Sequence, residues 1–119
     1  MVPHMDEALA KRLYRFCRRL NMDVTLGGVY VQTTGPRFET KAEINFFRRF
    51  GDIVGMTLAS EATLCMEQRI PYVSLCSVDN YGNGITRKPL TIQEVARSAK
   101  GSRQALERLV RALVQENGP

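Results

Sequence analysis

Six side chains that suit the binding of a flat, polar ligand follow the strands expected along this chain. In open α/β sheets, ligands bind at the carboxyl ends of the strands, so these side chains should share one edge of the sheet. Together they offer aromatic and apolar surface, two carboxylates and a hydroxyl, which suits a planar ligand with directional hydrogen bonds. The pattern alone indicates such a ligand and no particular reaction. The six are Phe38, Glu39, Met56, Thr57, Asp79 and Tyr81.

The elements that must position these residues alternate between helices and strands. Residues rich in Val, Ile, Tyr and Thr predict strands at 24–34, 52–56 and 72–79. Apolar residues at helical spacing predict helices at 6–21, 40–50, 60–70 and from 91 towards the end of the chain. This order implies a single domain, residues 1–119, with a three-layer α/β/α fold around a mostly parallel or mixed sheet.

Local signals mark where several of these helices begin. Thr40 with Glu43, and Thr91 with Glu94, have the spacing of capping boxes, in which each side chain bonds the backbone of the other residue. Ser60 is the expected N-cap of the third helix. The glycine-rich stretch 81–89 is expected to be a loop beside the ligand.

Composition narrows the class of protein. The net charge is +5, with basic residues clustered on the first expected helix, a pattern more typical of a solvated helix face than of a nucleic-acid site. No apolar run approaches the roughly 20 residues needed to cross a membrane. The single His and the three widely spaced cysteines fit no metal or disulfide framework, and we expect the cysteines to be small core residues of a cytoplasmic protein.

Three segments resemble one enzyme family. Residues 28–43, Gly-Val-Tyr-Val-Gln-Thr-Thr-Gly-Pro-Arg-Phe-Glu-Thr-Lys-Ala-Glu, look like the signature of the trimeric purine nucleoside and methylthioadenosine phosphorylases. Residues 54–61, Val-Gly-Met-Thr-Leu-Ala-Ser-Glu, are similar to the stretch of that family that touches ribose and phosphate. Ser-Val-Asp at 77–79 stands where the family has its purine-specificity loop. The resemblance covers essentially residues 1–90, and the last helix fits the family's terminal helix.

The resemblance implies phosphorolysis, in which phosphate and a nucleoside give a free purine and ribose 1-phosphate. Inorganic phosphate is then a co-substrate, and no cofactor or metal is expected. Phosphate attacks the anomeric carbon through an oxocarbenium-like state, so the protein must orient phosphate, stabilise charge and help the purine to leave.

The family's roles transfer to matching positions. Phe38 would pack on the purine or ribose, although it also suits a core aromatic beside a turn. Glu39 would accept hydrogen bonds from the Watson–Crick edge, although a carboxylate in a first helical turn is also favoured by the helix dipole. Met56 would lie against the ribose, although a Met that ends a strand is often plain core filling.

The remaining roles concern phosphate and the leaving group. Thr57 would donate its hydroxyl to phosphate, with a local hydrogen bond as the alternative. Asp79 would hold or share the proton at N7 that makes the purine a better leaving group, with a surface carboxylate as the alternative. Tyr81 stands where the methylthioadenosine branch usually has a second Asp. Arg37 could help to neutralise phosphate, but a structural pairing with Glu43 or Asp52 is favoured.

Base preference is mixed. Glu39 followed by Thr40 resembles the 6-oxopurine enzymes, whereas Asp79 resembles the methylthioadenosine branch. The balance favours methylthioadenosine or a related purine nucleoside. The family's glycine-rich phosphate loop and its Arg-His pair have no counterpart here, so the chain matches the carboxy-terminal half of the family. A homo-oligomer or a complementary amino-terminal half chain is therefore an expected partner.

Three other functions stay open. A nucleosidase would use water in place of phosphate. A non-catalytic truncated homologue would serve as a binding or assembly module, with an exposed sheet edge that demands a partner. An RNA-binding domain would need exposed aromatics among the basic residues, and it is the least favoured of the three.

Overall fold

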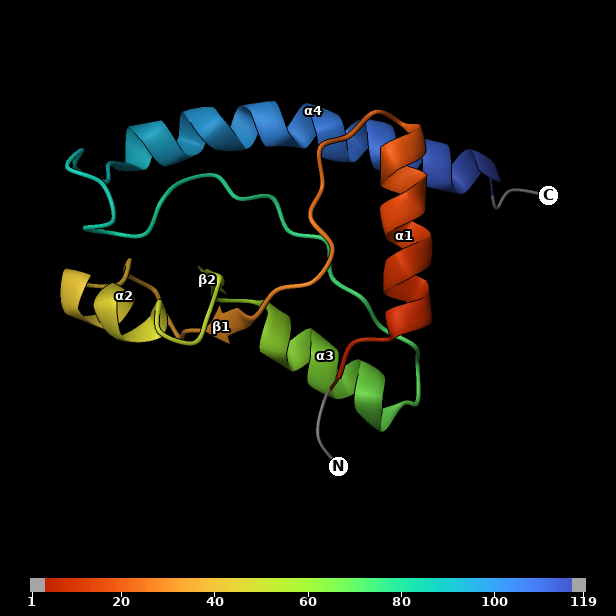
Figure 1. The fold of residues 1–119 in the computed structure, drawn as a ribbon, viewed down its shortest axis with the longest axis horizontal. Helices are drawn as coiled ribbons and strands as arrows, with labels where there is room; N and C mark the ends of the chain where they lie inside the picture. The colour runs from red at the N-terminus through yellow and green to blue at the C-terminus, as the bar shows by residue number, and fades with distance from the viewer. Residues whose placement is uncertain (1–3, 117–119) are drawn as a thin grey trace.

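The computed structural model describes residues 4–116, which form four helices and two short strands (Figure 1). The two strands pair in parallel, with Tyr30 opposite Ile53 and Gln32 opposite Gly55. The α/β character and the parallel pairing that the sequence predicts are therefore confirmed. The elements are α1 (Glu7–Arg19), β1 (Tyr30–Gln32), α2 (Lys41–Phe47), β2 (Ile53–Gly55), α3 (Leu58–Glu67) and α4 (Ile92–Glu116).

The third expected strand is not formed. Residues 71–79 have no regular secondary structure, and the sheet of the described residues has only β1 and β2. A strand exists only through hydrogen bonds to a neighbour, and no segment of 4–116 pairs with this stretch. One backbone contact anchors its start, where the amide of Asp6 donates to the carbonyl of Tyr72 at 2.8 Å. The described residues thus contain a two-stranded sheet in place of the three-layer arrangement predicted.

The first capping box forms as predicted. The Thr40 hydroxyl accepts from the Glu43 amide at 3.2 Å, and the Glu43 carboxylate accepts from the Thr40 amide at 2.6 Å. The second box forms in part: the Thr91 hydroxyl accepts from the amide of Glu94 at 3.3 Å, while the Glu94 carboxylate pairs with Lys88. The starts of α2 and α4 were therefore readable from local sequence.

The start of α3 differs from the prediction. Thr57, not Ser60, occupies the N-cap position, and its side chain makes no capping hydrogen bond. The strand supplies the missing acceptor, because Oε1 of Gln32 in β1 accepts from the amide of Ala59 at 3.0 Å. A side chain distant in sequence thus satisfies an orphan N–H of the first turn. This contact holds the helix beside the carboxyl end of the sheet, where Thr57 lies.

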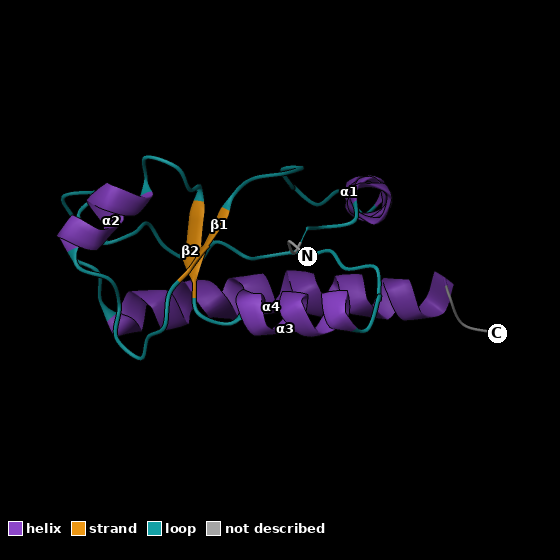
Figure 2. Ribbon diagram, turned by 90° about the horizontal axis from the view of Figure 1, so that it is seen from below, coloured by secondary structure: helices purple, strands orange, loops and turns teal. Residues whose placement is uncertain are grey.

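The main core lies between α1 and α4, away from the sheet. Phe16 and Cys17 of α1 and Leu109 of α4 are buried together, with Leu75 of the irregular stretch packed against them. Figure 1 shows α4 running along one side of the molecule, with the end of α1 against its carboxy-terminal part. The expectation for Cys17 as a core residue is confirmed, whereas Cys76 is exposed. Figure 2 shows the strands and α2 on one side of α1, and the last turns of α4 on its other side.

Candidate functional site

The connection from β1 to α2 contains a glycine that brings two motifs together. Gly35 has a φ of +62°, a left-handed conformation that L-residues adopt at a cost. A Cβ at this position would lie 2.7 Å from Sδ of Met56, so the backbone approaches Met56 more closely than any side chain permits. The expected ligand-binding Met56 therefore lies directly against the turn that leads to Phe38 and Glu39.

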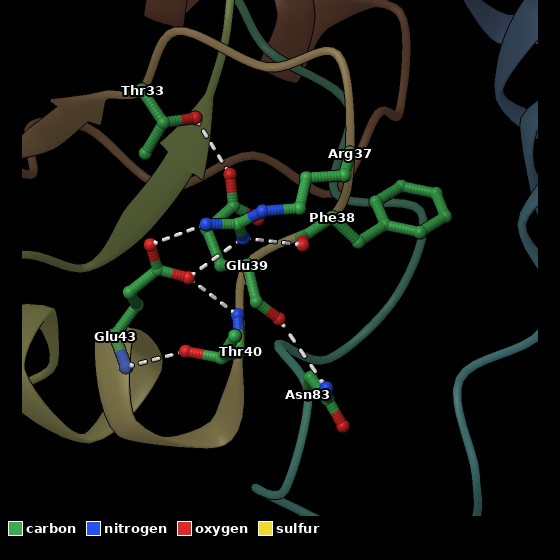
Figure 3. A network of polar contacts seen from close by, with 7 residues as sticks. All are labelled: Thr33, Arg37, Phe38, Glu39, Thr40, Glu43 and Asn83. Atoms are coloured by element: carbon green, nitrogen blue, oxygen red, sulfur yellow. Dashed lines mark hydrogen bonds and ion pairs between the residues drawn. The ribbon is translucent and has the colours of Figure 1, made fainter.

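Arg37 has a structural partner, as the sequence favoured. Its guanidinium makes two parallel hydrogen bonds to Glu43, each of 2.9 Å, and a third to the carbonyl of Phe38 at 3.0 Å (Figure 3). The hydrogen bonds from Arg37, and then those from Thr40, lower the pKa of the Glu43 carboxyl to about 2. Both terminal nitrogens of Arg37 are engaged, so this side chain fixes the start of α2.

Glu39 is held by two residues that sequence reasoning missed. The Thr33 hydroxyl donates to Oε1 of Glu39 at 2.6 Å, and the Asn83 side-chain amide donates to the Glu39 carbonyl at 3.3 Å. Figure 3 shows these contacts reaching Glu39 from opposite ends of the residue. Thr33 lies within the segment 28–43 that resembles the enzyme family, so this resemblance could have pointed to Thr33. Asn83 lies in a loop outside the three similar segments, so no sequence pattern pointed to it. Half-buried Glu39 is thus fixed at its side chain and at its backbone.

The glycine-rich loop packs against α2. A Cβ at Gly82 would lie 3.0 Å from the Ile44 side chain, and one at Gly84 would lie 2.8 Å from Cγ of Lys41. The two glycines therefore permit the close approach that lets Asn83 reach Glu39. Through Asn83, this loop brings the Phe38–Glu39 segment next to the residues that follow position 79.

Asp79 lies between the loop and α4. Its Oδ1 accepts from the Ser102 hydroxyl at 2.7 Å, a contact that no local sequence pattern announces because Ser102 stands within a long helix. Asp79 and Tyr81 line one cavity of about 360 Å³ with Asn83 and Arg97. A second cavity, of about 620 Å³, is lined by Asp79, Ser102 and the following turns of α4. Asp79 is therefore anchored, half-buried and adjacent to space for a ligand.

The aromatic candidates lie open. Phe38 is 42% exposed and Tyr81 is 72% exposed, so neither is filling the core. In Figure 3 the ring of Phe38 points away from the Arg37–Glu43 pair. Thr57 is also exposed, at the N-terminus of α3.

The six candidates fall into three groups rather than one pocket. Phe38 and Glu39 precede α2, Met56 and Thr57 link β2 to α3, and the third group follows the irregular stretch 71–79. Gly35 joins the first group to the second, and Asn83 joins the first to the cavity that Asp79 and Tyr81 line. No hydrogen bond within residues 4–116 links Glu39 directly to Asp79.

Neither a metal site nor a membrane-spanning helix is present in the described part of the chain. Among residues 4–116, no group of His, Cys, Asp or Glu has the arrangement of a metal site. Within the same range, no helix combines the length and the apolar character needed to span a membrane.

Comparison with known proteins identifies relatives along the whole chain. The family described as the Phosphorylase superfamily matches residues 1–115. A probable 6-oxopurine nucleoside phosphorylase from Archaeoglobus fulgidus is 38% identical over 117 residues, which make up 98% of this chain and 48% of the relative.

Two further relatives have different substrates in their names. A probable S-methyl-5′-thioinosine phosphorylase from Methanocaldococcus jannaschii is 51% identical over 73 residues, 61% of this chain and 29% of the relative. An S-methyl-5′-thioadenosine phosphorylase from Pyrococcus horikoshii is 36% identical over 106 residues, 89% of this chain and 41% of the relative. The chain spans less than half the length of these curated relatives.

Proposed function

Because this chain belongs to the phosphorylase superfamily, we propose that it forms the purine- and ribose-binding side of a purine nucleoside phosphorylase, a pentosyltransferase. The observation that carries the proposal is the position of the Asp79 carboxylate. This carboxylate is held by Ser102 at 2.7 Å and lines a cavity of about 360 Å³ with Tyr81 and Asn83. A carboxyl group fixed beside such a space can hold or share a proton with the N7 atom of a purine.

The reaction breaks the glycosidic bond of a nucleoside and forms a bond from phosphate to the anomeric carbon. Electrons from the broken bond move onto the purine, which leaves as the free base with a proton at N7. Asp79 holds that proton, and Met56 and Phe38 pack on the ribose and base. Thr57 donates its hydroxyl to phosphate; its side chain is exposed and makes no capping hydrogen bond, so the hydroxyl can serve a ligand.

The substrate that the sequence favours is S-methyl-5′-thioadenosine or a related purine nucleoside. According to their names, the three relatives act on 6-oxopurine nucleosides, S-methyl-5′-thioinosine and S-methyl-5′-thioadenosine. A 5′-methylthio purine nucleoside is common to two of these three names. Such a nucleoside is therefore the substrate class proposed here.

Thr57 alone is too little to bind phosphate. Arg37, the arginine of the segment 28–43, is engaged with Glu43. The remaining phosphate ligands would come from another copy of this chain, from a complementary chain, or from further residues of a longer protein. Those additional residues or that second chain would also supply strands that pair with the edges of the β1–β2 sheet, as the predicted three-layer fold requires.

The proposal is tested by titrating the chain calorimetrically with adenine, hypoxanthine and S-methyl-5′-thioadenosine, with and without phosphate. Binding of a base that weakens in Asp79→Ala, with an unchanged unfolding midpoint, would support it. Lys100→Ala is the matched control, because Lys100 is an exposed residue of α4 that lines neither of the two cavities beside Asp79. A folded chain that binds no purine would contradict the proposal and favour the assembly module. Turnover that needs no phosphate would favour the nucleosidase.

A further inference from the structure

We propose that Thr33 is a positioning residue that fixes the Glu39 carboxylate in one orientation and thereby makes the site prefer 6-oxopurines to 6-aminopurines. The proposal rests on the proposed function, because it needs a purine at Glu39. It concerns a residue outside the six that the sequence singled out. The base preference it predicts runs against the adenine-type substrate that the sequence favours.

Thr33 is itself rigidly placed. Its amide donates to the carbonyl of Gly55 at 2.8 Å, which continues the β1–β2 ladder by one residue. A β-branched side chain on an extended backbone has few available rotamers. The Thr33 hydroxyl is therefore fixed by the sheet, whereas the Glu39 side chain belongs to a connecting segment.

The single proton of that hydroxyl has two acceptors within reach. Oε1 of Glu39 lies at 2.6 Å and the carbonyl oxygen of Gly55 at 3.4 Å. The shorter, charge-assisted contact is the stronger one. The proton thus goes to Glu39, and Oε1 of that carboxylate is occupied before any ligand arrives.

The other oxygen of Glu39 is left for a ligand. Within residues 4–116, Oε2 accepts no hydrogen bond, although the Arg37 guanidinium is only two residues away in the chain. Three of the five guanidinium N–H groups of Arg37 serve Glu43 and the Phe38 carbonyl, and none of these three bonds uses Oε2 of Glu39. Oε2 is therefore the acceptor that Thr33 leaves for a ligand.

An ionised carboxylate can only accept hydrogen bonds. A 6-oxopurine presents a donor, N1–H, on its Watson–Crick edge, whereas a 6-aminopurine presents N1 as an acceptor and its donor on the exocyclic nitrogen. A mobile Glu39 could shift to follow either donor. A Glu39 held by Thr33 cannot, so the unmatched base loses a hydrogen bond and leaves a polar group unpaired.

The test compares Thr33→Val, which removes the hydroxyl, with Thr33→Ser, which keeps it. The contact itself is measured without ligand, from the 13C resonance of the Glu39 carboxyl group in the labelled chain. Thr33→Val should move that resonance and Thr33→Ser should leave it near its wild-type position. If both variants leave it in place, no contact exists and the proposal is overturned.

Calorimetric titration with hypoxanthine and adenine then tests specificity. The wild type should bind hypoxanthine about tenfold more tightly, and Thr33→Val should reduce that ratio to about twofold, a roughly fivefold effect in the range of one net hydrogen bond. Thr33→Ser should restore the ratio. Unfolding midpoints confirm that each variant is folded.

The outcomes separate the two proposals. A wild type that prefers adenine, or a ratio that Thr33→Val leaves unchanged, overturns the role of Thr33 while the proposed function stands. A folded wild type that binds neither base overturns both, even if the carboxyl resonance shows the contact.

Discussion

Arg37 and Glu43 form an ion pair in which each terminal nitrogen of the guanidinium lies 2.9 Å from a different oxygen of the carboxylate. The pair spans the start of α2 and includes the carboxylate that completes the Thr40 capping box. One carboxylate therefore satisfies an arginine and a backbone amide at once. Such two-point geometry is more specific than a single charge contact.

Acid should weaken this arrangement. The pKa of Glu43 is lowered from 4.5 to about 2, chiefly by Arg37. A carboxyl group with a lower pKa in the folded state stabilises the fold above its unfolded pKa, and this contribution is lost as the pH falls through the folded pKa. We therefore expect the unfolding midpoint of the wild type to exceed that of Glu43→Gln at neutral pH, with the difference closing between about pH 4.5 and pH 2.

The control for this prediction is Glu107→Gln, which breaks an exposed pair with Arg103 inside α4. Exposed helical pairs contribute only about 0.3–0.5 kcal/mol. Glu107→Gln should therefore show little change across the same pH range. A Glu43→Gln variant whose midpoint follows the wild type at every pH would contradict the prediction.

The contact between α1 and α4 should dominate stability. Leu109 is 3% exposed and lies against Phe16 and Cys17. Leu109→Ala should lower the free energy of unfolding by about 2–5 kcal/mol, because it removes buried methyl groups and leaves a cavity. Urea unfolding monitored by circular dichroism measures the loss. The neighbouring Val110→Ala, at a position 57% exposed, should change the same quantity by less than about 0.5 kcal/mol.

Ser102 should matter through Asp79. Ser102→Ala removes the 2.7 Å hydrogen bond and should weaken binding of the preferred base about fivefold, or ~1 kcal/mol for a half-exposed pair. Ser102→Thr keeps the hydroxyl and should bind normally. In Asp79→Asn the further change to Ser102→Ala should have a smaller effect than it has alone. Equal effects in both backgrounds would show that Ser102 acts independently of Asp79.

Two glycine substitutions should have opposite signs. Gly35→Ala forces an L-residue to a φ of +62° and places Cβ 2.7 Å from Sδ of Met56, so it should destabilise the fold by about 1–2 kcal/mol. Gly101→Ala lies in the interior of α4, with nothing within 4 Å of the new Cβ, and should stabilise the fold by about 0.5–1 kcal/mol. Thermal unfolding of both variants measures this. Gly35→Ala at or above the wild-type midpoint would be the contradicting result.

Local features of this chain were predictable from sequence. The Thr40–Glu43 box, the extent of α1 and the parallel strands all rest on spacing within a few residues or on the alternation of helices and strands. The structural role of Arg37 was also anticipated. The family membership followed from the segment 28–43 and its two companions, which the comparison along residues 1–115 confirmed.

Long-range features were not predictable. Residues 71–79 have the composition of a strand, but strand formation needs a neighbour that composition does not reveal. The first turn of α3 is capped by Gln32 and not by Ser60. The side chain of Gln32 accepts from the amide of Ala59, which lies 27 residues away in the sequence. Two partners were missed for the same reason: Asn83 lies 44 residues from Glu39, and Ser102 lies 23 residues from Asp79. The roles assigned to the six site residues remain predictions.

The contact between α1 and α4 closes most of the described chain into one long loop. Arg19 and Glu116, 97 positions apart, bind each other at 2.8 Å and 3.0 Å beside the main core. Bringing such distant segments together costs roughly 4 kcal/mol of loop-closure entropy before the core can compensate. Contacts this distant are typical of slow folding. Every residue proposed to touch ligand lies inside that closed loop, so loss of the contact between α1 and α4 would remove the constraint on both ends of the segment that carries the site.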